Sequence, residues 1–273
     1  MPYRIIASDL DGTLLGADYT VSKENWEAIA RMCERGVWFV PTSGRAYGEM
    51  PVELLESPLI RYYITSDGAT VYDKQTDTTY ELPMPREVGW QVLDKLYQYP
   101  VCLMVHADTR AYVEAATHNP ADYAAFHMSP YWIDFAMDKE TPVADLKRFV
   151  YGLPALQSVV AFFKNEEDLN ACRAYFETFP TLIVAQTDSH NLEIFSATAG
   201  KGNALLLLAE LLSVEREETI AMGDSTNDYT MLQAAGLGLA MANAVPELKA
   251  VADAVICDYR DHGMKYILEQ YIG

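Results

Sequence analysis

The sequence predicts an α/β fold, in which a Rossmann-like parallel-sheet core carries an inserted α+β domain. Short apolar runs alternate with amphipathic helical stretches at both ends of the chain, which is typical of parallel strands with helices on both faces of the sheet. From Pro83 to about residue 189, this alternation gives way to a mixed pattern that is rich in aromatic residues. We therefore expect a core made of residues 1–83 and 190–273, interrupted by a second domain of residues 84–189.

The first half of the core reads as strand, helix, strand, helix and strand. Residues 5–7 are contiguous and apolar, with two β-branched side chains, as in a strand that is buried on both faces. Ser22 is a candidate N-cap for the first helix, and Gly36 is a candidate stop. The other elements expected in this half are strands at residues 37–40 and 60–64, a helix between residue 44 and residue 56, and a hairpin at residues 71–73 and 78–80.

In the inserted stretch, helices are followed by strands without the crossover connections of a parallel sheet, so we expect an antiparallel sheet. The elements expected there are helices at residues 88–97 and 166–176 and strands at residues 101–106, 158–164 and 181–185. The pattern does not assign residues 112–135 to any element. Beyond residue 190 the core pattern returns, with helices at residues 201–212 and 231–235, strands at residues 219–222, 238–241 and 254–256, and a last helix that ends near residue 271.

Composition and charge exclude several classes of protein. The formal net charge of −19 argues against nucleic acid and anionic membranes as partners. The longest apolar stretch, residues 204–212, is too short to span a membrane, and the run at residues 5–7 is too short for a signal peptide. The four cysteines lack the spacing of a zinc site, so we expect reduced thiols and a cytoplasmic protein. A monomer and a homodimer both remain open.

The strand at residues 5–7 runs into Asp9 and Asp11. At strand spacing, positions i and i+2 point to the same side, so the two carboxylates are expected to lie together. Such a pair needs a compensating cation at neutral pH. For this stretch alone, a plain Asp-Gly turn is an equal alternative. A calcium loop of the EF-hand kind is excluded, because Thr20 stands where that loop requires a bidentate glutamate.

Other polar clusters stand after a predicted strand or at the start of a helix: Thr42 and Ser43, Lys201, and Asp224 and Asp228. In an open parallel sheet, the loops at the carboxyl ends of the strands line one crevice. Carboxylates in excess of cations suit Mg²⁺, and a hydroxyl, a lysine and a helix N-terminus after Gly44 form a phosphate cradle. This combination predicts phosphoryl transfer, with an aspartate available as the nucleophile.

Four ordered motifs resemble those of the haloacid dehalogenase superfamily. They are the DLDGT run at residues 9–13, Ser43 after a strand, Lys201 in a KGxAL segment, and the GDSTND run at residues 223–228. The neighbouring TSGR, SDGATVYD and AGLGLAMANA segments, with the long insert between the second and third motifs, resemble the Cof-type phosphatases that carry a C2 (IIB) cap. The resemblance covers the whole chain and is strongest at its two ends.

The resemblance implies a role for each matching residue. Asp9 is implied as the nucleophile that forms an aspartyl-phosphate, and Asp11 as the acid that protonates the leaving oxygen and later activates water. Mg²⁺ is the implied cofactor, with Asp9, Asp224 and the backbone of Asp11 as its ligands. Lys201 is implied to orient the nucleophile as well as to bind phosphate.

The remaining residues of the implied site fall into two groups. The phosphate-binding residues are Ser43, Gly44 and Lys201, and the supporting residues are Thr42, Arg45, Ser225, Asn227 and Asp228. For Arg45 the sequence leaves two readings open, contact with phosphate and pairing with surface acids. The family pattern also has an asparagine where this chain has Asp67. That extra carboxylate either adds to metal affinity or repels a dianionic phosphate, or it simply occupies a Ser-Asp-Gly turn.

The expected function is Mg²⁺-dependent hydrolysis of a small phosphate monoester, such as a sugar phosphate or a phosphorylated cofactor. The cap is expected to close over the crevice and to select the substrate. Two other functions remain open: a phosphomutase of the phosphomannomutase kind, and a non-catalytic sensor of a phosphorylated metabolite. The sequence does not identify the substrate, because the selecting residues lie in the insert, where His118 and His127 are candidate contacts.

Overall fold

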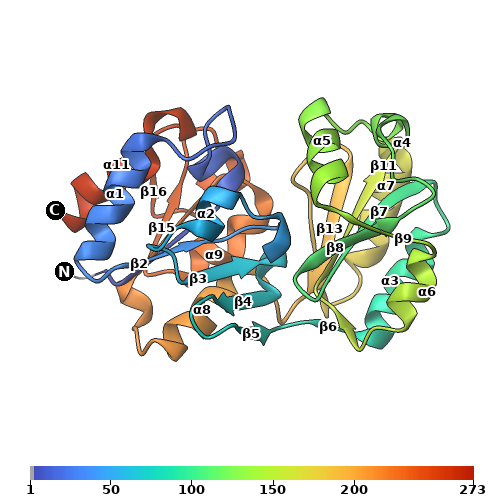
Figure 1. Ribbon diagram of the computed structural model, residues 1–273, viewed down its shortest axis with the longest axis horizontal. Helices are drawn as coiled ribbons and strands as arrows, with labels where there is room; N and C mark the ends of the chain where they lie inside the picture. Colours follow the sequence, from blue (N-terminus) through green and yellow to red (C-terminus); the bar gives the residue numbers. More distant parts are fainter. Residues whose placement is uncertain (1–2) are drawn as a thin grey trace. The chain divides into compact units, whose positions relative to one another are not determined.

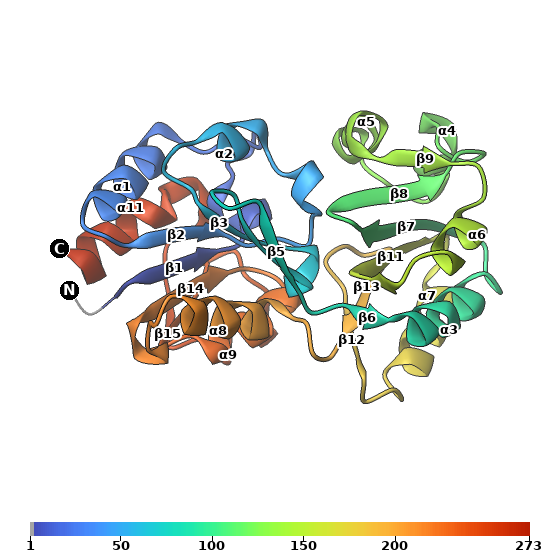
Figure 2. The ribbon, with the colours of Figure 1, turned by 60° about the horizontal axis from the view of Figure 1, so that its bottom comes forward.

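The computed structural model describes residues 3–273 as two units (Figures 1 and 2). Met1 and Pro2, with which the expected core begins, lie outside the described residues. The first of the two units, which we call the core unit, consists of the described part of Met1–Gly44 together with Met50–Tyr80 and Gly200–Gly273. The second, the inserted unit, consists of Arg45–Glu49 and Glu81–Ala199.

The core unit is built on a five-stranded parallel sheet. In spatial order its strands are β16 (Ala254–Val255), β15 (Leu237–Ala240), β14 (Thr219–Gly223), β1 (Ile5–Ser8) and β2 (Trp38–Pro41). Every residue of β1 is buried, as expected for a strand with neighbours on both edges and helices on both faces. The predicted Rossmann-like parallel core is therefore confirmed.

A further strand continues from this sheet. An isolated parallel bridge joins Thr42, at the end of β2, to Ile64 in β3 (Tyr62–Thr65). The strand β3 then pairs antiparallel with β4 (Thr70–Asp73), and β5 (Thr78–Glu81) follows β4 in the same small sheet.

Helices cover both faces of the core sheet. They are α1 (Lys23–Glu34), α2 (Val52–Glu56), α8 (Lys201–Leu211), α9 (Tyr229–Ala234), α10 (Pro246–Lys249) and α11 (Gly263–Ile267). Figure 2 shows α1 and α11 on one face of the sheet and α8 and α9 on the other. As predicted, Ser22 is the N-cap of α1, and its side chain accepts the backbone N–H of Asn25.

The inserted unit has a six-stranded sheet. In spatial order its strands are β12 (Leu182–Ala185), β13 (Asn191–Ser196), β11 (Ser158–Phe163), β7 (Val101–Ala107), β8 (Arg110–Glu114) and β9 (Thr141–Val143). Its pairs are antiparallel, as expected, except that β8 and β9 run parallel. A small antiparallel pair, β6 (Met84–Pro85) with β10 (Ala155–Leu156), completes its strands among the described residues.

Helices lie on both faces of the inserted unit's sheet (Figure 2). On one face are α3 (Arg86–Leu96), α6 (Leu146–Tyr151) and α7 (Glu166–Phe176), and on the other are α4 (Pro120–Ala125) and α5 (Pro130–Lys139). Each face has its own apolar cluster. The larger cluster includes Leu93, Val150 and Phe176, and the smaller one includes Tyr123 and Ile133.

The boundaries between the two units along the chain differ from the expected ones. The inserted unit extends to Ala199 because β13, which we expected in the core, pairs with β11 and β12. It also includes the short segment Arg45–Glu49. The expected helix after Gly44 is absent there: a 3-10 turn spans Tyr47–Glu49, and α2 begins only at Val52. Among residues 3–273, no helix is both long enough and apolar enough to cross a membrane.

Candidate active site

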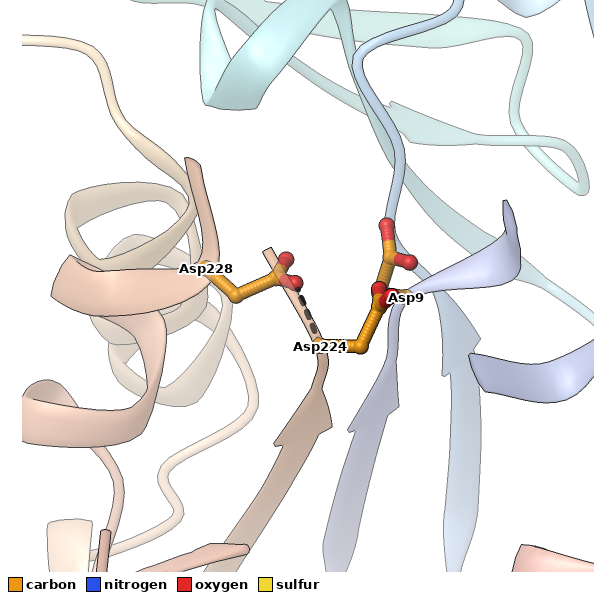
Figure 3. Close-up of side chains that lie close together, drawn as sticks. All are labelled: Asp9, Asp224 and Asp228. Atoms are coloured by element: carbon orange, nitrogen blue, oxygen red, sulfur yellow. Dashed lines mark hydrogen bonds between the residues drawn. The ribbon is translucent and has the colours of Figure 1, made fainter. Parts of the chain in front are cut away.

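Three carboxylates converge at the carboxyl ends of two neighbouring strands of the core sheet. Asp9 directly follows β1, and Asp224 directly follows β14, its parallel neighbour. Asp228 ends a 3-10 turn, Thr226–Asp228, shortly after β14. One carboxylate oxygen from each of the three lies within 4.8 Å of the others (Figure 3). The sheet topology therefore brings together residues that are more than two hundred positions apart in the chain.

Two glycines make this close approach possible. Gly12 has a φ of +79°, and a Cβ atom there would lie 2.4 Å from Asp224 Oδ2. A Cβ atom on Gly223 would lie 2.4 Å from the carboxyl group of Asp228. Any larger residue at either position would displace a carboxylate of the cluster.

Asp11 lies outside this cluster of three carboxylates. The strand β1 ends at Ser8, and residues Leu10–Leu14 form an irregular turn, so strand alternation does not reach Asp11. Its side chain is partly exposed, whereas Asp9 is buried. The strand-spacing argument therefore does not apply to Asp11, although its charge acts on the cluster and adds to the rise in the pKa of Asp224.

Lys201 supplies a cation to the cluster. It is the first residue of α8, and its side chain is fully buried. Its Nζ donates to Asp9 Oδ1 at 2.7 Å and to Asp228 Oδ1 at 2.6 Å. Burial by itself lowers the pKa of this lysine, but the charges of Asp228 and Asp9 outweigh burial and raise it. The ammonium group therefore stays charged.

One ammonium does not balance three carboxylates. Burial raises the pKa of Asp9 well above its usual range, and the charges of Asp228 and Asp224 raise it further, against the opposing effect of Lys201. Burial, followed by the charge of Asp228, raises the pKa of Asp224 to about 7. The charges of neighbouring carboxylates add to the effect of burial in both shifts, because three carboxylates share one ammonium. Oxygen ligands in this excess fit a hard divalent cation such as Mg²⁺.

Hydrogen bonds hold the carboxylates of Asp228 and Asp224 in place. Asp228 Oδ2 accepts the backbone N–H groups of Asp224 at 2.9 Å, drawn in Figure 3, and of Ser225 at 3.1 Å. Thr13 Oγ1 donates to Asp224 Oδ1 at 3.3 Å. Asn243 Nδ2 donates to Asp224 Oδ2 at 3.3 Å and to the carbonyl oxygen of Gly12 at 2.8 Å.

Thr13 and Asn243 were not predicted as site residues. Thr13 lies within the DLDGT run and Asn243 within the AGLGLAMANA segment, so both were inside stretches that the family resemblance singled out. A polar side chain in an otherwise apolar run was the available signal for Asn243.

The predicted phosphate-binding loop follows β2 at the same edge of the core sheet. The backbone N–H of Thr42 donates to the carbonyl oxygen of Ser8, beside Asp9, at 2.8 Å. The Thr42 hydroxyl donates to the carbonyl oxygen of Val40, which makes it part of the local backbone structure. Ser43 is buried and its N–H donates to Ile64. Since no α-helix starts after Gly44, the helix N-terminus expected in the phosphate cradle is not there.

Asn227 and Asp67 form a buried pair beside the cluster. Asn227 Nδ2 donates to Asp67 Oδ1 at 3.0 Å, and Asp67 has no exposed surface. Asp67 lies in the 3-10 turn Ser66–Gly68 with a φ of 53°. A turn at this Ser-Asp-Gly sequence was one of the three readings considered for this residue.

The remaining candidates lie in the inserted unit. Arg45 is buried, with its guanidinium 4.9 Å from the ring centre of Trp132 and 4.6 Å from that of Phe135. His118 Nδ1 lies 2.7 Å from the hydroxyl of Tyr123. His127, whose ring stacks on that of His190 at 4.1 Å, donates from Nε2 to the carbonyl oxygen of Lys164.

Comparisons with known proteins find similar sequences and structures over almost the whole chain. The sequence model of the haloacid dehalogenase-like hydrolases matches residues 6–268. Phosphatase YwpJ of Bacillus subtilis is 28% identical and aligns over 98% of this chain and 100% of that protein. The 5-amino-6-(5-phospho-D-ribitylamino)uracil phosphatase YwtE of the same organism is 27% identical, over 99% of this chain and 98% of that protein.

Solved structures are similar over almost the whole chain. A haloacid dehalogenase-like hydrolase from B. subtilis superimposes with a TM-score of 0.83 at 27% identity, covering 98% of this chain and 99% of that one. The HAD subclass IIB sugar phosphatase BT4131 superimposes with a TM-score of 0.81 at 19% identity, covering 98% of both chains. The second likeness concerns the fold alone.

Proposed function

Because the chain belongs to the haloacid dehalogenase-like hydrolase family and to the phosphatase class of its named relatives, we propose that it hydrolyses small phosphate monoesters with Asp9 as the nucleophile. The observation that carries this proposal is the contact between Asp9 and the fully buried ammonium of Lys201, at 2.7 Å, inside a cluster of three carboxylates. A carboxylate held by a buried cation next to further acids is equipped to attack phosphorus.

In the proposed reaction, an oxygen of Asp9 forms a bond to phosphorus while the ester bond to the leaving oxygen breaks. Asp11 gives its proton to that leaving oxygen. In the second step Asp11 takes a proton from water, which attacks the aspartyl-phosphate and releases inorganic phosphate. The partial exposure of Asp11 and its place outside the three-carboxylate cluster support this role, because water can reach its side chain.

Ser43, Gly44 and Lys201 are proposed to hold the phosphoryl oxygens. Lys201 has a second task, since its bond to Asp9 Oδ1 orients the nucleophile. Thr42 and Ser225 are proposed to support these groups through their backbone N–H groups, which donate to the carbonyl oxygen of Ser8 and to Asp228 Oδ2. Asn227 and Asp228 are proposed to support the metal through hydrogen bonds.

Mg²⁺ is the proposed cofactor, with Asp9, Asp224 and the backbone of Asp11 as ligands. The fit rests on the three converging carboxylates and on the raised pKa of Asp9 and Asp224. When bound, the ion reduces the repulsion between the nucleophile and a phosphate dianion. The inserted unit is proposed to act as the substrate-selecting cap.

The proposed substrates are small phosphorylated metabolites, either sugar phosphates or phosphorylated cofactors. The named relatives support this class, since they include two enzymes named for a phosphoribitylamino-uracil and others named for HMP-PP. We also propose that the protein acts in the cytoplasm. Its four free cysteines are consistent with a reducing compartment.

A phosphate-release screen over a panel of phosphorylated metabolites tests the proposal. The parent protein with Mg²⁺ should release phosphate from at least one of them, whereas a chelator or the substitution Asp9→Asn should abolish the release. Transfer of phosphate between positions of a sugar, in excess of release, would instead indicate a phosphomutase. Binding of a phosphorylated metabolite without any turnover would indicate a sensor.

A further inference from the structure

Asp67 links several parts of the core unit's site, although its carboxylate lies outside the three-carboxylate cluster. Its backbone N–H donates to the carbonyl oxygen of Ser43 at 3.2 Å, and its own carbonyl oxygen accepts the N–H of Gly200 at 2.9 Å. Gly200 is the N-cap of α8, the helix that begins with Lys201. Asp67 therefore connects the predicted phosphate-binding loop, through Ser43, to the start of α8, through Gly200.

We propose that Asp67 is a positioning residue, whose carboxylate fixes the side-chain amide of Asn227 in one orientation. Asn227 Nδ2 donates to Asp67 Oδ1 at 3.0 Å, and both side chains are buried. An ionised carboxylate only accepts hydrogen bonds, so it selects the NH₂ side of the amide. The carbonyl oxygen of Asn227, an acceptor, is then the end of the amide that does not face Asp67 Oδ1. The inference rests on the proposed function, in which Asn227 supports the metal.

The backbone conformation at residue 67 does not explain why this residue is an aspartate. Asp67 is in the left-handed region, with φ 53° and ψ 36°, which asparagine and aspartate tolerate about equally and glycine tolerates best. The two side chains differ in hydrogen bonding: an amide at residue 67 both donates and accepts, so it would hold Asn227 in either of two orientations. The carboxylate leaves only one.

The surroundings of Asp67 favour a role in the site over a role in stability. Its Oδ2 is buried and has no hydrogen-bond partner among the described residues, and a buried, half-paired carboxylate is unfavourable for folding. Its charge acts instead on the site, since Asp67 is one of the three carboxylates that outweigh burial and raise the pKa of Lys201.

Two substitutions separate the backbone from the side chain. Asp67→Gly keeps the left-handed backbone and removes the carboxylate, and Asp67→Asn keeps one acceptor but lets the Asn227 amide adopt both orientations. We expect kcat to fall about 10-fold or more in Asp67→Gly, which is the usual size of such indirect effects. The fall in Asp67→Asn should be smaller, and KM should change little in either variant. A merely structural residue would lower the melting temperature of both variants and leave kcat unchanged.

The second measurement does not depend on activity. In the parent protein, the side-chain NH₂ signals of Asn227 should be shifted by their hydrogen bond and protected from hydrogen exchange in NMR spectra. Asp67→Gly should remove both properties. The NH₂ group of Asn165 serves as the internal reference, because it donates to Asp168 at 2.9 Å in the inserted unit and should not change.

The outcomes distinguish this inference from the proposed function. If Asp67→Gly leaves either kcat or the Asn227 signals unchanged in an active phosphatase, the positioning role of Asp67 is refuted. If the parent protein hydrolyses no phosphate ester but the Asn227 signals respond as expected, the proposed function fails and the orientation of Asn227 by Asp67 stands.

Discussion

The carboxylate cluster of the core unit and buried Glu140 of the inserted unit have different kinds of partner. In the core unit, three carboxylates lie around one buried ammonium, that of Lys201. In the inserted unit, buried Glu140 accepts a hydrogen bond from the neutral hydroxyl of Tyr123 at 2.5 Å. Burial raises the pKa of Glu140 to about 7, against the hydrogen bond from Tyr123, which lowers it. A single proton therefore neutralises Glu140 near neutral pH, with no other ligand required.

This difference separates a binding site from a structural hydrogen bond. In the core unit the lysine is already charged, yet the pKa of Asp9 and Asp224 is still raised. Buried charge in excess of its partners is costly unless something else offsets it, and in the core unit three carboxylates share one ammonium. Four predictions test whether the two units differ in this way.

Removing the proposed nucleophile should have the largest effect. We expect Asp9→Asn to lower kcat by about 10⁴-fold or more, in line with losses of a nucleophile in other enzymes. It should not lower the free energy of unfolding by much, since a raised pKa means that Asp9 is destabilised in its charged form. The matched change in the inserted unit, Glu140→Gln, should leave kcat within about 2-fold of the parent. Phosphate release from the best substrate measures both, and equal losses in the two variants would contradict the distinction.

Removing the ammonium should weaken both activity and stability. We expect Lys201→Met to lower kcat by about 10²- to 10³-fold, because a buried electrostatic contact to the nucleophile is lost. Without metal, it should also lower the free energy of unfolding by about 3–5 kcal/mol, since buried carboxylates lose their cation. Added Mg²⁺ should reduce this loss of stability.

The control for that substitution is Lys147→Met in the inserted unit. Lys147 pairs with Asp94 at 2.7 Å, but both side chains are exposed, so its loss should change the free energy of unfolding by at most about 1 kcal/mol. Urea unfolding measures both variants. A loss from Lys147→Met as large as that from Lys201→Met would show that the buried position of Lys201 has no special importance.

Metal binding should stabilise the core unit's site. Mg²⁺ at about 100 times its dissociation constant should add about 2.7 kcal/mol to the free energy of unfolding, seen as a rise in melting temperature. Asp224→Asn should remove most of this rise because it removes one carboxylate of the cluster. Glu140→Gln should retain it. If added Mg²⁺ leaves the melting temperature of the parent protein unchanged, this result would argue against the metal site.

The last prediction concerns pH and the inserted unit. The pKa of Glu140 is about 7 when folded, against 4.5 as its ordinary value. The folded state therefore holds this proton more tightly, and the resulting stability is fully present below about pH 4.5 and is lost as the pH rises through about 7. The difference amounts to about 3 kcal/mol at most. Urea unfolding at pH 5 and pH 8 should show this loss in the parent, and the contribution should be absent in Glu140→Gln.

Much of the core site could be predicted because its residues follow strands directly. Buried apolar runs reveal parallel strands, and the ends of neighbouring parallel strands meet at one edge of the sheet. Asp9 and Asp224 come together for this reason. The family resemblance, which the match over residues 6–268 confirms, placed Lys201 and Asp228 in the same site. The contact of Lys201 with both Asp9 and Asp228 agrees with it.

The remaining features depend on packing that local pattern does not encode. The residues of β13 were expected in the core, and only the pairing of this strand with β11 and β12 places it in the inserted unit. The segment Arg45–Glu49 joins the inserted unit through contacts such as that of Glu49 with His106, at 3.2 Å. Neither contact has a signal in local sequence, because each depends on how separate elements of the chain pair or pack.

The central claim is that phosphorus is transferred to the side chain of Asp9, and trapping the intermediate tests it most directly. The parent protein, incubated with Mg²⁺ and its best substrate and then quenched in acid, should yield a proteolytic peptide that contains Asp9 and carries the mass of one phosphoryl group. The same peptide from Asp9→Asn should carry none. A turnover-competent parent whose phosphoryl group is found on another residue, or on none while Asp9→Asn remains active, would contradict the account.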